Sequence, residues 1–338
     1  MEAGALGYFA GGACDEVTLR DNVAAWRRWR LRPRVLTGVG KARTAATVLG
    51  ADLSMPVLVA PVAYQRLADE EGEVAMARAA AAAGTVMCLS TLATVRPSEV
   101  AAQVPDGRRW FQLYCFRDRG VTRALMEEAM EAGFEAIVVT VDAPPGGRRE
   151  RDLRTGFRIP AGLGVPSVSA ALGGDREVTI EETFALMDPS LGWRDLDAIA
   201  SECSVPLVVK GVLSAEDAAL AVEHGAAGVI VSNHGGRQLD CVLAGADALP
   251  EVVDAIDGRA SVLVDGGVRR GTDVAIALAL GADAVLVGRP ALWGLATAGA
   301  QGAQHVLELL RDELALALAF CGCASPADLS PAHVQRAP

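Results

Sequence analysis

The sequence is short of positive charge and contains no long apolar run. Its 338 residues include 31 lysines and arginines against 42 aspartates and glutamates, which gives a formal net charge of −11. Nucleic-acid-binding proteins usually carry a basic surface, and an anionic membrane would repel a chain of this charge. No apolar run reaches the ~20 residues of a membrane-spanning helix. We therefore expect no nucleic-acid partner and no membrane partner.

Recognisable cysteine and targeting motifs are also missing. The seven cysteines are odd in number and scattered, and the closest pair, Cys321 and Cys323, has neither zinc-site nor C-x-x-C spacing. The first residues lack the basic and apolar regions of a signal peptide. We expect reduced thiols, no metal and a cytoplasmic location.

Aromatic residues make up only 4% of the chain, although hydrophobic residues make up 51%. Alanine, valine and leucine supply most of this apolar content, which suits helices and buried strands better than a β-sandwich. Eight apolar runs alternate with helical stretches, and the runs are continuous, as is typical of parallel strands covered on both faces. The runs are 57–60, 86–89, 110–114, 136–141, 207–210, 228–232, 262–265 and 284–288; the helical stretches are 69–83, 97–103, 121–132, 193–203, 214–224, 246–256, 271–280 and 290 onward.

This order of elements predicts an α/β fold, a (β/α)8 TIM barrel over about residues 55–300. We expect short N- and C-terminal additions, within a single domain of residues 1–338. No G-x-G-x-x-G motif follows the first run, which argues against a doubly wound sheet. One interval, residues 143–192, is much longer than the others. It follows the fourth strand, on the face where barrel active sites lie, so we expect an active-site loop there.

Polar side chains stand at the predicted C-terminal ends of the strands, where barrel enzymes carry their catalytic residues. A purely structural barrel has no need of them, so we expect a catalytic site. They are Tyr64, Ser90, Gln112, Tyr114, Thr140, Asp142, Lys210, Ser232, His234, Arg237, Asp265, Arg269 and Arg289.

The ends of the last two strands carry glycines and arginines, at the usual phosphate site of this fold. Glycines let backbone N–H groups approach a phosphate, and Arg269 and Arg289 add charged donors. Ordinary glycine turns are the alternative for Gly266, Gly267 and Gly288. We expect a phosphate-bearing ligand.

Three other groups at the strand ends indicate chemistry. His234 is interpreted as a general base, because imidazole titrates near neutrality and Asp142 could orient the ring. Arg148 and Arg149 open the long loop and could bind a carboxylate together with Arg237, although the charged run 148–154 alone would suggest a solvated surface. Lys210 ends an apolar strand and needs an anion or a polar ring; a Schiff-base lysine and a partner for a flavin both stay open.

Five segments resemble the FMN-dependent α-hydroxy acid oxidase/dehydrogenase family, which includes glycolate, lactate and mandelate oxidases. They are SNHGGRQLD (232–240), VDGGVRRG (264–271), VVKG (208–211), WFQLY (110–114) and TVD (140–142). The likeness runs from about Tyr8 to Ser330. It implies FMN as cofactor and oxidation of an (S)-2-hydroxy acid to the 2-keto acid, with O2 reduced to H2O2.

The resemblance also implies a role for each residue. The catalytic set is His234 as base, Asp142, Lys210 and Tyr114, with Lys210 facing the N1/C2=O edge of the flavin. Substrate is bound by Tyr8, Tyr114, Arg149 and Arg237. FMN is bound by Pro61, Val62, Ala63, Ser90, Gln112, Thr140, Lys210, Ser232, Asp265, Gly266, Gly267, Arg269, Gly288 and Arg289.

This sequence differs from the family pattern in two places, one that concerns the substrate and one at the N-terminus. Leu92 stands where the short-chain glycolate enzymes have tryptophan, which favours a larger substrate, and residues 60–67 resemble the bacterial 4-hydroxymandelate oxidases. We expect an aryl substrate such as mandelate or 4-hydroxymandelate. Family members commonly have a further helix before the Tyr8-Phe9 segment. A homo-oligomer, a tetramer by family likeness, is expected.

Four alternatives stay open at this point. In the first, the enzyme oxidises a lactate- or glycolate-like acid or a natural-product intermediate. In the second, the chain is another FMN barrel, such as an isomerase or a nucleotide dehydrogenase. A flavin-free aldolase would use Lys210 to form an imine. A carboxylate-binding scaffold barrel without chemistry is the remaining alternative.

Overall fold

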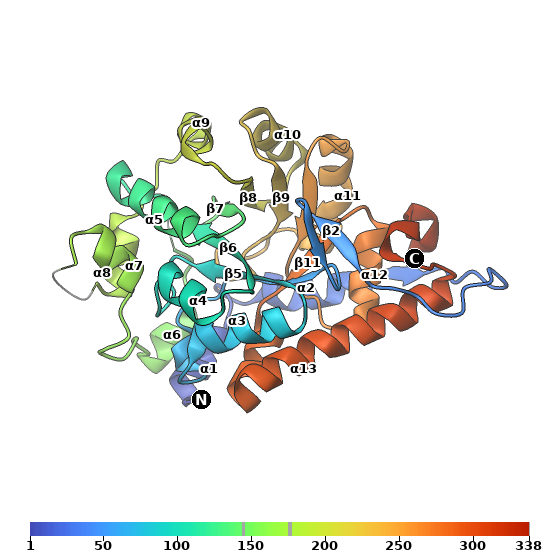
Figure 1. Cartoon of the computed structure of the whole chain (residues 1–338), viewed down its shortest axis with the longest axis horizontal. Coiled ribbons are helices and arrows are strands. Elements are labelled where there is room, and N and C mark those ends of the chain that lie inside the picture. The colour runs from blue at the N-terminus through green and yellow to red at the C-terminus, as the bar shows by residue number, and fades with distance from the viewer. Residues whose placement is uncertain (144–145, 175–177, 338) are drawn as a thin grey trace.

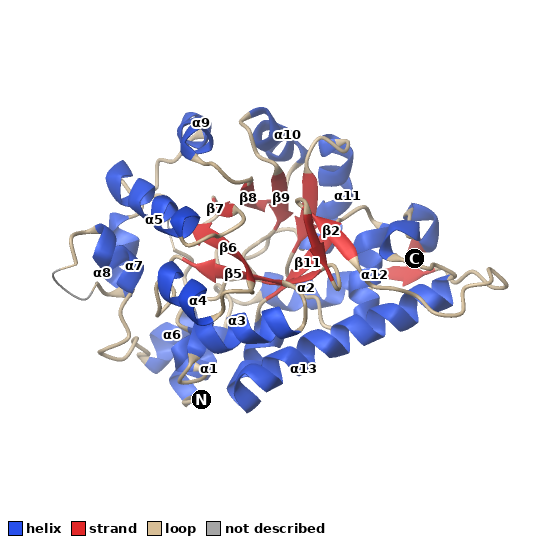
Figure 2. Ribbon diagram, in the orientation of Figure 1, coloured by secondary structure: helices blue, strands red, loops and turns tan. Residues whose placement is uncertain are grey.

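The computed structural model describes residues 1–143, 146–174 and 178–337, and its centre is a closed eight-stranded barrel (Figures 1 and 2). Every neighbouring pair of barrel strands is parallel, and the last strand pairs with the first through Val285 and Val57. The predicted TIM barrel is confirmed. Its strands are β4 (Val57–Val59), β5 (Val86–Ser90), β6 (Arg108–Leu113), β7 (Ile137–Thr140), β8 (Leu207–Val212), β9 (Gly228–Val231), β10 (Ser261–Val264) and β11 (Ala284–Val287).

Helices surround the barrel and agree with the predicted stretches. Ser214 caps the helix after β8, because its hydroxyl accepts a hydrogen bond from the Asp217 amide at 3.2 Å. The last helix is interrupted at Ala298 and Gly299, whose backbone angles are not helical. The helices are α3 (Gly72–Ala82), α4 (Pro97–Gln103), α5 (Arg119–Glu131), α9 (Trp193–Glu202), α10 (Ala215–Glu223), α11 (Gly245–Ile256), α12 (Gly271–Ala279) and α13 (Arg289–Cys321).

Strand residues alternate between the helix layer and the barrel interior. Leu58, Trp110 and Ile230 belong to an interior cluster, which the hairpin of β2 (Ala46–Val48) and β3 (Ala51–Leu53) joins. The hairpin packs with residues at the starts of the strands and so closes that end of the barrel. The polar residues are left at the opposite, C-terminal end.

The predicted additions are folded onto the barrel. Two helices, α1 (Ala3–Ala10) and α2 (Val17–Trp26), precede it, and β1 (Trp29–Leu31) pairs antiparallel with β12 (Val334–Arg336), so the two additions meet. Among the described residues, no helix has the length and apolarity needed to cross a membrane. Short 3-10 turns are η1 (Gln65–Leu67), η2 (Pro326–Asp328) and η3 (Pro331–His333).

The expected long loop contains helices that the sequence did not indicate. They are α6 (Glu150–Thr155), α7 (Pro166–Ala171) and α8 (Ile180–Leu186), each too short for a clear periodicity. Thr179 and Glu182 form a capping box at α8. Helix α6 lies against α1, as Figure 1 shows, so the loop reaches the N-terminal segment.

Candidate active site

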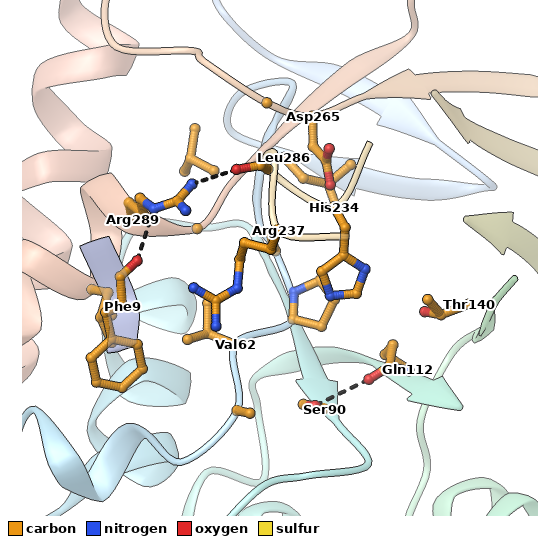
Figure 3. A pocket seen from close by; sticks show the side chains of 18 of the residues that line it. Phe9, Val62, Ser90, Gln112, Thr140, His234, Arg237, Asp265, Leu286 and Arg289 are labelled. Atoms are coloured by element: carbon orange, nitrogen blue, oxygen red, sulfur yellow. Dashed lines mark hydrogen bonds between the residues drawn. The ribbon is translucent and has the colours of Figure 1, made fainter. Parts of the chain in front are cut away.

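A cleft opens at the C-terminal ends of the barrel strands (Figure 3). Nearly all residues that the sequence singled out line it. Asp142 and Ser232 do not, but they contact residues that do, and the buried Tyr64 does not line it either. The lining residues named above are Tyr8, Pro61, Val62, Ala63, Ser90, Gln112, Tyr114, Thr140, Arg149, Lys210, His234, Arg237, Asp265, Gly266, Gly267, Arg269, Gly288 and Arg289.

His234 and Asp142 form a pair between the loops after β9 and β7. The Nδ1 atom of His234 lies 2.9 Å from Oδ1 of Asp142, and the His234 amide donates to the Ser232 hydroxyl at 3.0 Å. Burial lowers the pKa of His234, and the charges of Lys210 and Arg237 add to this, although Asp142 opposes it. The imidazole is therefore neutral at pH 7. With Nδ1–H directed to Asp142, its Nε2 atom is available as a proton acceptor.

Asp142 stays ionised beside this ring. Burial alone would raise its pKa, but the interactions with His234 and Lys210 outweigh burial and the pKa of Asp142 lies below its usual value. An ionised carboxylate on Nδ1 stabilises the ring when it takes up a proton.

Lys210 is a buried cation below the cleft. Its Nζ donates to the Ser232 hydroxyl at 2.9 Å and lies 3.2 Å from Oδ2 of Asp265. Burial would lower the pKa of Lys210, but Asp265 and Asp142 raise it above its usual value. Because a Schiff base forms from the neutral amine, this environment disfavours the aldolase alternative.

Four buried polar atoms near the cleft have no hydrogen-bond partner within the described parts of the chain. Since buried polar groups are almost always paired, a cluster of such atoms points to a polar ligand. The Ser90 hydroxyl holds Oε1 of Gln112 at 3.0 Å, which leaves the Nε2 donor for that ligand. The four atoms are Gln112 Nε2, Thr140 Oγ1, Asp142 Oδ2 and Asp265 Oδ1.

These groups fit an isoalloxazine ring. Its edge carries carbonyl and ring-nitrogen acceptors together with an N–H donor, and the cleft offers the donors Gln112 and Lys210 as well as an acceptor at Asp265. The ring is also broad and flat, and Pro61, Val62 and Ala63 line the cleft with small apolar surfaces.

The arginines of the cleft engage the end of α1. Arg237 donates through Nη1 to the carbonyl oxygen of Tyr8 at 2.6 Å, and its guanidinium lies 5.0 Å from the centre of the Tyr8 ring. The guanidinium of Arg149 lies 5.6 Å from the same ring. Burial and the charge of Arg149 lower the pKa of Arg237. Two neighbouring half-buried cations of this kind favour an anionic ligand.

Arg289, which we expected to bind a phosphate, already donates hydrogen bonds to the protein backbone. Its guanidinium donates to the carbonyl oxygens of Phe9, Gly11 and Gly235 at 2.9, 2.9 and 3.0 Å. Burial, with Arg237 and Arg269 nearby, lowers the pKa of Arg289 to about 9. These bonds use three of its five N–H groups, and the other two have no partner among the described residues and could bind an anion.

The approach of a ligand is not the only reason why glycines follow β10. A Cβ on Gly267 would lie 1.8 Å from the carbonyl oxygen of Asn22 in α2, and Gly267 has a φ of +79°. The indole of Trp26 donates to the Gly266 carbonyl at 2.9 Å. The close packing of α2 therefore requires glycine here, whatever binds in the cleft.

Several residues near the cleft were missed by sequence reasoning. Phe184 lines it from α8, and the capping-box residues Thr179 and Glu182 were an available local signal for the start of that helix. Gln238 also lines it, and its position directly after Arg237 in the SNHGGRQLD segment was an available signal. Asp240 of the same segment accepts from the amides of Val17 and Thr18 and so caps α2.

Comparison with known proteins agrees with this geometry. Residues 1–336 match the family model described as FMN-dependent dehydrogenase. An L-lactate oxidase from Nostoc sp. is 49% identical, over 96% of this chain and 92% of the relative, and glycolate oxidase 3 from Arabidopsis thaliana is 49% identical, over 97% and 90%. A structure of mandelate oxidase with (S)-4-hydroxymandelic acid has a TM-score of 0.92 at 41% identity, covering 100% of this chain and 96% of that one. This chain belongs to the FMN-dependent dehydrogenase family, among its 2-hydroxy acid oxidases, and its cofactor is FMN.

Proposed function

We propose that this protein oxidises an (S)-2-hydroxy acid with an aryl side chain to the 2-keto acid and passes the electrons to O2, which gives H2O2. The observation that carries the proposal is the pair of His234 Nδ1 and Asp142 Oδ1, 2.9 Å apart, in the same cleft as the half-buried Arg237. A base and a carboxylate-binding cation side by side match a substrate whose reacting C–H is next to a carboxylate.

The residues proposed to hold FMN form three groups. Pro61, Val62 and Ala63 would lie against the ring, which supplies a two-electron acceptor when bound. Ser90, Gln112, Thr140, Lys210 and Ser232 would bond the ring and ribityl chain. Asp265, Gly266, Gly267, Arg269, Gly288 and Arg289 would hold the ribityl chain and the phosphate.

The side chains proposed to act on substrate have separate tasks. Arg149 and Arg237 bind the carboxylate, and the hydroxyls of Tyr8 and Tyr114 help to orient it. His234 takes a proton at Nε2, and Asp142 stabilises the resulting imidazolium. Lys210 would supply a positive charge to the bound ring, because Asp265 and Asp142 raise its pKa and keep it protonated.

Apolar residues support the aryl substrate. Leu92 is 3% exposed and lines the cleft together with Phe184, and no tryptophan is among the described residues that line it. Two similar structures, both of mandelate oxidase, contain (S)-4-hydroxymandelic acid and benzoyl-formic acid. The second candidate is a lactate- or glycolate-type substrate, favoured by the oxidases of those acids at 49% identity.

A panel of hydroxy acids tests the proposal. Purified FMN-loaded protein is mixed without oxygen with glycolate, L-lactate, (S)-mandelate or (S)-4-hydroxymandelate, and bleaching of the flavin band is followed. We expect fastest bleaching with the two aryl acids and stoichiometric H2O2 when air is admitted. Bleaching by glycolate or lactate alone would favour the second candidate, and no bleaching by any hydroxy acid would refute the proposal.

The assembly is proposed on likeness alone. We propose a homo-tetramer, and light scattering of the holoprotein after gel filtration measures its mass. A monomer mass at micromolar concentration would contradict this.

A further inference from the structure

Two loops carry the four side chains at the centre of the proposed chemistry. Asp142 and Arg149 follow β7, whereas His234 and Arg237 follow β9. The two loops are far apart in sequence, so something must set the distance between them. Positions within a fraction of an ångström matter for such a site.

The carboxamide of Gln238 joins these loops with both of its ends. Its Oε1 accepts from the Gly147 amide at 2.9 Å, and its Nε2 donates to the carbonyl oxygens of Ala143 at 2.9 Å and of Asp142 at 3.3 Å. One half-buried side chain thus holds the backbone beside Asp142 and the backbone just before Arg149. An amide side chain can do this because it carries a donor and an acceptor on separate atoms.

Gly147 shows independently how closely the loops approach. A Cβ on Gly147 would lie 2.2 Å from the carbonyl oxygen of Arg237 and 2.6 Å from Cα of Gln238. These obstructing atoms belong to the backbone and cannot rotate away. The absence of a side chain at Gly147 is therefore what allows the two loops to touch.

We propose that Gln238, seated against Gly147, is a positioning residue that aligns Asp142 with His234 and Arg149 with Arg237. Gln238 accepts no proton and binds no carboxylate itself; it acts through the residues on the two loops. The inference rests on the proposed function, since it concerns the same reaction. A further bond, from the Cys14 amide to the Arg148 carbonyl at 2.9 Å, ties the β7 loop to the N-terminal segment, so loss of Gln238 loosens the loop without releasing it.

The test compares Gln238→Met and Gly147→Ala with the wild-type holoenzyme. Gln238→Met keeps the length of the side chain and removes both hydrogen-bonding ends, while Gly147→Ala leaves Gln238 in place and forces the loops apart. Gln335→Met is the matched control, because Gln335 is exposed on β12, away from the cleft. Anaerobic reduction of the flavin by (S)-mandelate gives an apparent Kd and a limiting rate.

We expect both cleft variants to bind FMN, to raise the apparent Kd and to lower the limiting rate, each on the order of tenfold, as expected of a misplaced group. The second-order rate constant for flavin reduction falls at low pH as His234 takes up a proton. The midpoint of this fall should also move to lower pH, because Asp142 no longer stabilises the protonated ring of His234. A variant that lost only thermal stability would keep the wild-type midpoint. The inference would be overturned if Gln238→Met kept the wild-type apparent Kd, the wild-type limiting rate and the wild-type midpoint of the pH profile.

Hydrogen exchange separates this inference from the proposed function. In wild-type holoprotein the Gly147 amide is bonded, so peptides covering residues 141–153 should exchange faster in Gln238→Met and unchanged in Gln335→Met. If no hydroxy acid reduces the wild type, the proposed function fails and this exchange result still decides whether Gln238 holds the loops together. Equal exchange in wild type and Gln238→Met would refute the link.

Discussion

The two ends of the barrel differ in how fully their groups are satisfied. At the hairpin end, Val48 and Leu53 pack on interior residues such as Trp110 and Ile230, and all four are at most 5% exposed. At the other end, polar atoms such as Gln112 Nε2 and Asp265 Oδ1 are buried without a partner in the described chain. The first end stabilises the fold, and the second end is complete only with a ligand.

The same contrast appears in the charges. Within the hairpin, residues 46–53, the one ionisable side chain is that of Asp52, and it is exposed. The cleft combines Lys210, Arg237 and Arg289 with Asp142 and Asp265. If this contrast is functional, substitutions in the cleft should alter the rate of flavin reduction. Substitutions at the hairpin end should instead alter the free energy of unfolding.

The largest expected effect is that of His234→Ala. Removal of the proposed base should slow anaerobic reduction by about 10²–10⁴-fold, the range measured for general acid–base groups. The protein should stay yellow, because the proposed FMN-holding residues are unchanged. His305→Ala, at an exposed histidine of α13, is the control and should reduce at the wild-type rate. Normal reduction in His234→Ala would remove His234 from the chemistry.

A smaller loss is expected from Arg237→Met. The substitution keeps the bulk of the side chain but removes the charge above Tyr8, and truncation of one partner of a buried charged pair costs about 2–5 kcal/mol, or at least about 30-fold in kcat/KM. Substrate affinity and reduction rate should both fall, as steady-state kinetics can measure. Arg311→Met, at a surface arginine of α13, serves as the control. Unchanged kcat/KM in Arg237→Met would place the carboxylate elsewhere.

The hairpin end should respond in the opposite way. Leu53→Ala removes a leucine that is 5% exposed, and such changes cost about 2–5 kcal/mol of unfolding free energy. Denaturant unfolding of the holoprotein measures this loss. The reduction rate of the folded variant should equal that of the wild type. A rate that falls together with stability would show that the two ends are coupled.

The parts that the sequence predicted are those set by local pattern. Continuous apolar runs predicted all eight barrel strands, because a strand covered on both faces shows its burial in its own residues. The polar strand ends were found for a related reason, since a barrel brings all C-terminal strand ends to one face. His234 and Lys210 could be placed near one cleft without any knowledge of the packing.

The parts that were missed depend on contacts between distant segments. Nothing near Gly267 in the sequence indicates that the Asn22 carbonyl would occupy the place of its Cβ. Likewise, Phe184 reaches the cleft only because of how residues 146–174 and 178–192 fold. Gln238 was visible in the motif, but its bond to Gly147 spans 91 positions of the chain.

The smallest expected effect is a shift in pH dependence. Because burial, Lys210 and Arg237 lower the pKa of His234, the second-order rate constant for reduction, which reports the free protein, should rise with pH through a midpoint below the usual histidine value of about 6.5. Above the midpoint His234 is neutral and the rate constant should be level. Asp142 acts in the other direction and raises the pKa of His234. Asp142→Asn should therefore move the midpoint to still lower pH and slow the reaction. Stopped-flow reduction between about pH 5 and 8 measures both midpoints. A midpoint above the usual histidine value, or an upward shift in Asp142→Asn, would contradict the assignment of the midpoint to this pair and would weaken the contrast between the two ends of the barrel.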